Sequence, residues 1–237
     1  MIVAEGDADV DIERAVVNSS QSFLTTVVGE DTDLLVLVPY YGRECQFPLL
    51  MRSDIKGNRD NIVHYISRYR MKLGTEISTY MLFLHTFTSC DSTSRISSIS
   101  KQAAFTRFIN SNLLQEVAKV FSSESKHYSE IERAGNNSMV ALFRGTPEES
   151  SNELRHRILL QKVTSAKSFV VPERLPSIES ATRFHSYRSY YQIMVWNLLD
   201  QGIHATDLGW ILGDSNKLVP VMTDMSPASE LLLKVIH

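Results

Sequence analysis

Acidic side chains gather at two places near the start of the chain, and carboxylates are the groups that hard divalent cations bind. Residues 1–33 contain eight acids and one base, a net charge of −7 in a chain whose total is −3, so the remaining residues carry +4. The clusters lie in "EGDADVDIE" and "GEDTD", and Asp91 stands alone after a later apolar segment. If these groups converge, they make a cation site beside a mildly basic surface. If they do not, they make a solvated acidic terminus.

The first cluster opens an expected helix over residues 7–18, in which Asp7 is placed to be the N-cap. Asp7 and Asp9 point apart on a regular helix, so they share a metal only if Asp7 lies at or before the cap. Glu5 with Asp9, or Asp7 with Asp11, are the pairs that a regular helix brings together. Acids in a first turn also favour the helix dipole and need no metal.

The second cluster precedes the apolar run "LLVLV". Asp31 and Asp33 project from one face if the backbone there is extended, because side chains alternate along a strand. The same residues are equally typical of a turn between strands. A phosphodiesterase that uses two metal ions needs carboxylates from several elements at one place, and spacing alone does not show such convergence.

The apolar runs around these acids predict an α/β fold. "SFLTTVV", "DLLVLVP" and "QFPLLMRS" lack clean alternation, which is typical of strands covered on both faces of a sheet. Periodic apolar positions elsewhere predict helices, and a late Gly-Asp-Ser-Asn turn predicts a β-hairpin. The expected strands span residues 22–28, 33–39 and 46–53, the helices span 7–18, 59–70, 75–87, 99–112, 113–121, 128–144, 151–163, 178–200 and 227–236, and the hairpin lies near 208–222.

Composition limits the class of protein. The 237 residues are 43% hydrophobic, enough for a sizeable core in one large domain or in one domain with an appended piece. Two cysteines, Cys45 and Cys90, make neither a disulfide framework nor a zinc site by count. No signal segment opens the chain, and no apolar run approaches the length of a membrane span. We therefore expect an intracellular protein of the nucleus or cytoplasm that has no membrane partner.

Three segments together resemble a known family. They read "EGDADVDIERA", "VVGEDTDLLVL" and "LFLHTFTSCDSTSRISSISKQAAFTRFI", and their order and intervals are similar to those of flap-endonuclease-like PIN domains. Through "FHSYRSYYQIMVW", "LGWILGDSNKLVPVMTD" and "ELLLKVI", the chain looks most like the transposon-associated PIN-like proteins of animals. The resemblance implies Mg²⁺- or Mn²⁺-dependent hydrolysis of a phosphodiester in branched or single-stranded DNA or RNA. The implied metal ligands and catalytic residues are Asp7, Asp9, Asp31, Asp33 and Asp91.

The resemblance also implies a fold, a parallel α/β sheet with helices on both faces. Residues 1–115 would be the C-terminal part of a PIN-like nuclease domain, and residues 116–237 a mainly helical region that carries the hairpin. In the family, a strand that ends in a metal-binding Asp precedes the first helix, and a cysteine-rich tail often follows. Because neither stands in this sequence, we expect a sheet that lacks its central strand.

A further departure concerns the expected contact with nucleic acid. The family has glycines seven and nine residues after its last acid, where backbone amides approach a phosphate, and this chain has Ser98 and Ser100. Serine still donates to phosphate but resists φ > 0 and adds bulk. With Lys101 and Arg107 these serines are the candidate nucleic-acid-binding residues, and Arg95 is a further candidate. Such contacts would be salt-dependent and largely independent of sequence, although the same charges also occur on ordinary solvated helices.

The segment "RFHSYRSYYQIMVWNLL" interleaves bases with aromatic residues, as in proteins that stack single strands. The helical spacing of Phe184, Tyr191, Val195 and Leu198 favours a core position instead.

His85 and His185 have no ligand partner at metal spacing, so both are interpreted as structural. Cys90 lacks a basic partner that would activate its thiol.

The sequence therefore predicts a degenerate or partial structure-specific nuclease, impaired as this chain alone. The alternatives are a non-catalytic module that binds nucleic acid or protein, and a mobile-element remnant without function.

Overall fold

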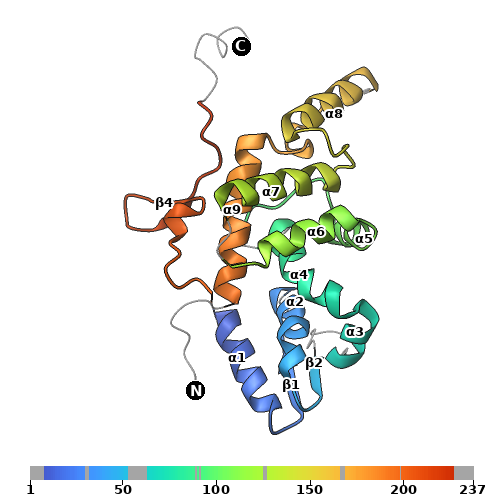
Figure 1. Cartoon of the computed structure of the whole chain (residues 1–237), viewed down its shortest axis with the longest axis vertical. Helices are drawn as coiled ribbons and strands as arrows, with labels where there is room; N and C mark the ends of the chain where they lie inside the picture. The colour runs from blue at the N-terminus through green and yellow to red at the C-terminus, as the bar shows by residue number, and fades with distance from the viewer. Residues whose placement is uncertain are drawn as a thin grey trace.

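A computed structural model describes residues 8–29, 32–52, 63–88, 90, 92–124, 127–165, 169–197 and 199–226. A small sheet with its helices occupies one end of the molecule, and a stack of helices occupies most of the rest (Figure 1). The described part is an α/β fold in which helices predominate. The helix predicted over residues 227–236 lies outside the described residues.

The sheet is small and mixed. β1 (Thr25–Val28) pairs in parallel with β2 (Leu49–Arg52), and β2 pairs antiparallel with β3 (Val63–Tyr65), in the order β1-β2-β3. The strands predicted over residues 22–28 and 46–53 are therefore confirmed in shortened form. A wholly parallel sheet was expected, and the described strands do not form one because β3 runs antiparallel.

The segment 33–39, predicted as a strand, is a helix. α2 (Thr32–Tyr41) connects β1 to β2, and a parallel strand pair requires a crossover of this kind. Leu34, Leu37 and Val38 are buried at helical spacing, and leucine is a strong helix former. The apolar run thus reflects a helix covered on several sides, which periodicity alone does not distinguish from a buried strand.

Two other helices and a short turn complete the sheet region. α1 (Ala8–Ser20) confirms the helix predicted over residues 7–18, and the 3₁₀ turn η1 (Gly42–Glu44) follows α2. α3 (Ile66–Leu73) is shifted from the helix predicted over residues 59–70. The shift arises because the three residues before α3 pair with β2, so that tertiary pairing overrides the local helical pattern.

The rest of the chain forms a stack of helices, and the sequence pattern predicted these helices to within a few residues. The predicted boundary between residues 115 and 116 falls inside α6, and the domain division stays a prediction. The helices are α4 (Thr75–Thr88), α5 (Lys101–Ile109), α6 (Asn112–Phe121), α7 (Tyr128–Leu142), α8 (Ser151–Ser165) and α9 (Glu179–Trp196), with the 3₁₀ turn η2 (Pro172–Arg174) before α9.

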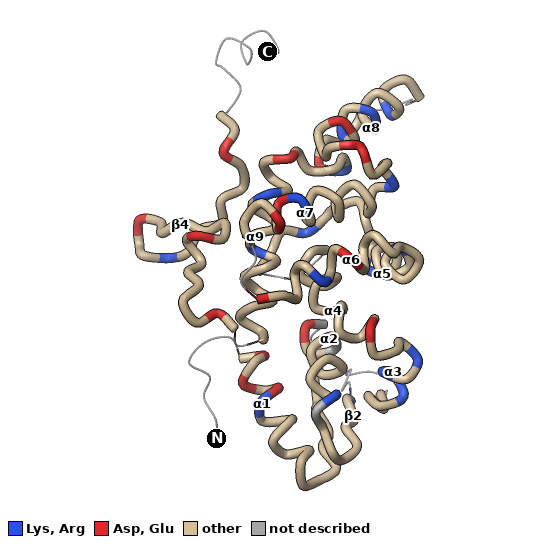
Figure 2. Tube along the Cα trace, viewed as in Figure 1, with Lys and Arg blue, Asp and Glu red and all other residues tan. Residues whose placement is uncertain are grey.

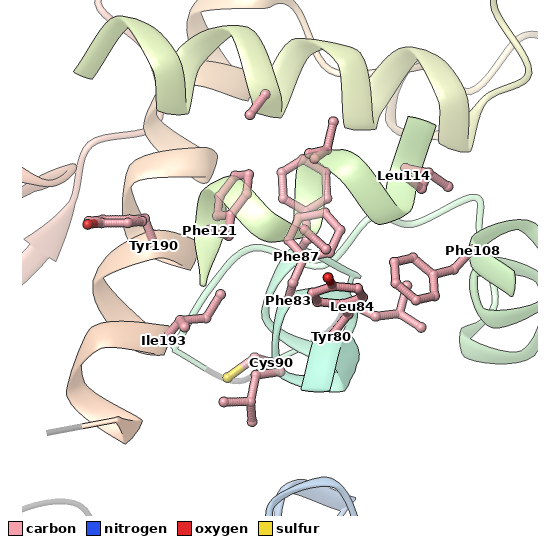
Figure 3. Packing of buried hydrophobic residues seen from close by; sticks show 14 of the residues in the cluster. Tyr80, Phe83, Leu84, Phe87, Cys90, Phe108, Leu114, Phe121, Tyr190 and Ile193 are labelled. Atoms are coloured by element: carbon pink, nitrogen blue, oxygen red, sulfur yellow. The ribbon is translucent and has the colours of Figure 1, made fainter. Parts of the chain in front are cut away.

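α4 is the centre of the main hydrophobic core (Figure 3). Its second half is buried on every side, which is the expected position for a helix without a polar face. The ring of Phe83 lies 5.4 Å from that of Phe87 and 4.8 Å from that of Phe121, measured between centroids. Aromatic pairs at these separations add stabilisation beyond the area that they bury.

α7 and α9 cross at very close range. A Cβ atom built on Gly135 of α7 would lie 1.7 Å from Oγ and 2.6 Å from Cβ of Ser186 on α9. The absence of a side chain at Gly135 is therefore what allows the two helices to approach. This contact fixes the position of α9 over α4.

The predicted hairpin is confirmed as β4 (Trp210–Leu212) and β5 (Leu218–Pro220), which follow the 3₁₀ turn η3 (Ala205–Asp207). The buried guanidinium of Arg188 on α9 donates a hydrogen bond of 2.5 Å to the carbonyl oxygen of Val221. The hairpin is thereby tied to the helical core. Among the helices in the described ranges, none combines the length and apolar character needed to cross a bilayer.

Candidate metal centre

The described residues of the two acidic clusters lie in α1 and at the start of α2, the helices before and after β1. α1 precedes β1 and contacts it, and α2 begins just after β1. Acidic residues are drawn near the starts of both helices in Figure 2. Asp9 lies in the first turn of α1 and Asp33 in the first turn of α2. Each carboxylate is also favoured by the dipole of its helix.

Three of the five acids implied as metal ligands, Asp7, Asp31 and Asp91, lie outside the described residues. Asp33 is the predicted ligand whose surroundings the structure defines best. Because Asp33 begins a helix, the extended backbone that would place it on one face with Asp31 is not found at this residue. Its side chain instead contacts the end of α4.

Asp33 pairs with a histidine from the helical core. Nε2 of His85, in the last turn of α4, lies 2.6 Å from Oδ1 of Asp33. The histidine side chain is 4% exposed and that of Asp33 is 13% exposed. The imidazole also stacks on the indole of Trp196 from α9, with ring centroids 6.0 Å apart and planes inclined by 14°. His85 is thus held between α2, α4 and α9.

Cys90 adds a sulfur atom to the same place. Its Sγ lies 3.9 Å from Oδ2 of Asp33 and 3.1 Å from Oγ of Ser92. The cysteine is 4% exposed. One donor atom each from Asp33, His85 and Cys90 can be chosen so that all three lie within 4.8 Å of one another. The structure therefore brings a carboxylate, an imidazole and a thiol together.

The carboxyl group of Asp33 is kept ionised by its neighbours. The hydrogen bond with His85 is the main cause that lowers the pKa of Asp33 below its usual value, and burial opposes it. The charges of His85 and of Lys101 on α5, and the hydrogen bond from Cys90, act in the same direction. An anion at this position is what a metal ligand requires.

A second carboxyl group of the first cluster has a different environment. Glu13 is 1% exposed, between α1 and its neighbours, and its two carboxyl oxygens have no hydrogen-bond partner among the described atoms. Burial, and secondarily the charge of Asp9, raise the pKa of Glu13 to about 8. Glu13 is therefore predominantly protonated at neutral pH, unlike a metal-binding carboxylate.

Of the four predicted nucleic-acid-binding residues, three use their side chains inside the fold. Oγ of Ser98 donates to the carbonyl oxygen of Arg174, 2.6 Å away, and Ser100 caps α5 by accepting from the amide of Ala103. Arg107 donates to the carbonyl oxygen of Leu142 at the end of α7. Lys101 is exposed, as are Ser98 and Ser100, and its charge acts on Asp33.

The aromatic segment of α9 contributes to the core, but not chiefly through the residues that its spacing predicted. Phe184, Tyr191 and Val195 are only partly buried, and Leu198 lies outside the described residues. Tyr187, Tyr190 and Trp196 are buried, and Phe184 and Tyr191 pack against them with partial exposure. His185 is structural, as expected. Its Nε2 lies 2.8 Å from the carbonyl oxygen of Phe87, and burial lowers its pKa to about 4.

Sequence reasoning missed His85 and Cys90 as partners of Asp33. They are separated from Asp33 by about fifty residues, and only the packing of α4 against α2 joins them. The available signal was the placement of a histidine and a cysteine at the end of an apolar helix, directly before Asp91.

Comparison with protein-family models, curated proteins and solved structures finds no match to this chain.

Proposed function

We propose that this chain is a nuclease-like protein, with an ancestral reaction of metal-dependent hydrolysis of a phosphodiester in DNA or RNA. The observation that carries the proposal is the position of Asp33. It lies in the first turn of α2, just after β1, and the hydrogen bond with His85 and the charge of Lys101 lower the pKa of its carboxyl group. A metal ligand and a phosphate-attracting charge at one place are what such a reaction needs.

The described residues have separate parts in this proposal. The imidazole of His85 holds Oδ1 of Asp33 in place and keeps the carboxyl group ionised. The positive charge of Lys101 attracts a phosphate toward Asp33. A bound divalent metal would supply an activated water and neutralise the charge that develops on phosphate.

Magnesium does not fit the described donor set. Magnesium prefers oxygen ligands, whereas the nearest donors to Asp33 are an imidazole nitrogen and a thiol sulfur. The expectation of Mg²⁺ or Mn²⁺ therefore depends on the resemblance, through Asp7, Asp31 and Asp91.

A non-catalytic binding module is the second candidate function. It is favoured by the internal hydrogen bonds of Ser98, Ser100 and Arg107. Because these side chains are engaged within the fold, they offer less to a phosphate than the family pattern implies. A module of this kind would bind nucleic acid weakly through Lys101, or would bind a protein partner.

Cleavage assays separate the two candidates. Flap, hairpin and single-stranded DNA and RNA would be incubated with the chain and with Mg²⁺, Mn²⁺ or Zn²⁺ in turn. The proposal predicts metal-dependent cleavage that is abolished in Asp33→Asn and retained in Asp214→Asn, a control at an exposed hairpin position. Cleavage that survives Asp33→Asn would contradict the proposed nuclease function. Salt-sensitive binding without cleavage in any metal would also contradict it, and would favour the non-catalytic binding module.

Binding measurements test the part of Lys101. Lys101→Gln is expected to reduce the slope of log affinity against log salt by about 0.7–0.9, the contribution of one phosphate contact. Lys217→Gln, on the exposed hairpin, is the matched control and should leave the slope unchanged. If the salt dependence of binding has the same slope in both variants, Lys101 does not contact a phosphate of the bound nucleic acid.

A further inference from the structure

We infer that Asp33, His85 and Cys90 form a binding site for a zinc-class transition-metal ion, with one carboxylate oxygen, one imidazole nitrogen and one thiolate sulfur as ligands. The inference goes beyond the proposed function and does not depend on it, because metal binding is measured without nucleic acid. It also reverses the expectation from cysteine count, which excluded zinc. A mixed O, N, S donor set needs only one cysteine.

The distances are close to those of a tetrahedral site. Zinc binds nitrogen and oxygen at about 2.0–2.2 Å and sulfur at about 2.3 Å, so neighbouring ligand atoms lie about 3.3–3.6 Å apart. Cys90 Sγ and Asp33 Oδ2 are 3.9 Å apart, slightly more than this separation. Asp33 Oδ1 and His85 Nε2 are 2.6 Å apart and are joined by a proton. Insertion of a metal would replace that proton and widen the pair by less than about 1 Å.

The three ligands are already held in position by different elements. The ring of His85 is fixed by its burial in α4 and by the stacked indole of Trp196. Cys90 lies next to Ser92, whose hydroxyl is within hydrogen-bond distance of the sulfur. Little conformational entropy remains to be lost on binding, and this raises affinity relative to a mobile set of ligands.

The chemistry of the donors selects the metal. Imidazole and thiolate favour zinc, iron and cobalt over magnesium and calcium, which prefer oxygen. Binding requires a deprotonated sulfur and an imidazole nitrogen without its proton. Zinc uptake therefore releases the thiol proton of Cys90 and frees Nε2 of His85, so affinity rises with pH. Three protein ligands leave a fourth position for water, as in catalytic rather than structural zinc sites.

The site also has a structural consequence. Asp33 belongs to the sheet region, whereas His85 lies in the last turn of the central helix and Cys90 is the second residue after that helix. A metal bound by all three would connect the two parts of the molecule across their contact. Because the metal would bind only the folded arrangement, it would raise the unfolding temperature, and the increase would grow with the logarithm of the free metal concentration once this exceeds the dissociation constant.

The test is a zinc competition titration of the purified chain against a chromophoric chelator, followed by cobalt substitution. We expect one zinc ion per chain, no displacement by millimolar magnesium, and a thiolate-to-cobalt charge-transfer band. Cys90→Ser should lose the band and bind zinc more than about tenfold more weakly. Cys45→Ser removes the other cysteine, which lies outside the cluster, and should behave as the unchanged chain.

Three results would overturn the inference. They are the absence of zinc binding at micromolar concentrations by folded protein, equal affinities of Cys90→Ser and Cys45→Ser, and a cobalt complex of Cys90→Ser that keeps the thiolate band. Circular dichroism of each variant shows whether it is folded. If Cys90→Ser does not fold, His85→Gln tests the same site and should weaken zinc binding to a similar extent.

Discussion

The sheet region and the helical region bury their apolar side chains to very different extents. Around α4, the main core contains aromatic rings and long aliphatic side chains from α4, α5, α6, α7 and α9, joined by Val10 of α1 and by Leu37 and Tyr40 of α2. The sheet region has a separate and smaller cluster, made of Val16, Val27, Leu34, Val38, Leu49, Met51 and Ile66. The helical region therefore has the larger share of the hydrophobic stabilisation, which scales with buried area.

The surface of the sheet region supports this contrast. Phe23, Leu24 and Phe47 are exposed near the start of β1 and β2, and Val63 and Tyr65 of β3 are exposed as well. Because the sheet region has a small core, its stability depends on its contact with the helical region, chiefly between α2 and α4. The candidate metal centre lies at that contact, where Leu37 and Tyr40 of α2 are buried in the main core. A bound metal would therefore add to the apolar packing that joins the two regions.

The largest expected effects come from matched leucine truncations in the two cores. Leu114→Ala in the helical core is expected to cost about 4–5 kcal/mol of unfolding free energy, the upper part of the range for buried leucine. Leu49→Ala in the sheet cluster should cost about 2–3 kcal/mol, because its less enclosed surroundings can relax into the space. Urea denaturation measures both. Equal costs, or a larger cost for Leu49→Ala, would contradict the difference between the regions.

A smaller but still substantial effect is expected at the crossing of α7 and α9. Gly135→Ala should destabilise the chain by about 2–3 kcal/mol, because the added methyl group overlaps Ser186. Arg133→Ala, on the exposed face of α7, is the control and should change stability by less than about 0.5 kcal/mol.

Ser186→Gly sharpens this test by removing the side chain that the new methyl group meets. The double variant should be less destabilised than the sum of the two single changes, by more than about 0.5 kcal/mol. Strict additivity would show that the cost at Gly135 arises elsewhere in α7.

The pH dependence of stability tests the burial of Glu13 in the sheet region. The folded state keeps the proton of Glu13 up to about pH 8, whereas the unfolded state releases it near pH 4.5. Stability therefore falls as pH rises between these values, by up to about 1.4 kcal/mol per pH unit. Glu13→Gln should flatten this part of the profile, and Glu116→Gln, which is exposed on α6, should not. A profile unchanged by Glu13→Gln would mean that the carboxyl group is hydrated.

The smallest expected effect concerns the cap of α5. Ser100→Ala should cost about 1 kcal/mol because the amide of Ala103 loses its acceptor, whereas Ser100→Gly should cost only a few tenths. Thermal unfolding measures both. If Ser100→Ala weakens nucleic-acid binding without changing stability, Ser100 contacts phosphate and is not only a cap.

Much of the fold follows from the sequence where one local pattern decides. The helices from α4 to α9 were predicted because their apolar positions recur at helical spacing, and the hairpin because of its turn residues. α2 was predicted as a strand instead of a helix, because the run "LLVLV" is apolar on every side and matches a buried strand equally well. β3 was missed because its pairing with β2 is a tertiary contact that overrides the helical pattern around it.

The residues of the candidate site were likewise predicted from the sequence only in part. Asp9 and Asp33 were proposed as metal ligands from their residue types and from the resemblance, and each lies in the first turn of a helix. Their role as ligands stays a prediction. His85 and Cys90 were interpreted singly, because a histidine and a cysteine five residues apart do not form a recognised metal motif. Their function as partners of Asp33 depends on how α4 packs against α2, which no local spacing specifies.

The metal ion proposed at the contact between the two regions has a sulfur ligand from Cys90. Zinc X-ray absorption spectroscopy of the loaded chain tests this most directly, because it resolves sulfur from lighter ligands. We expect one sulfur at about 2.3 Å and nitrogen or oxygen at about 2.0–2.2 Å, with the sulfur lost in Cys90→Ser and kept in Cys45→Ser. A shell of nitrogen and oxygen alone, or a sulfur that persists in Cys90→Ser, would contradict the proposed ligand.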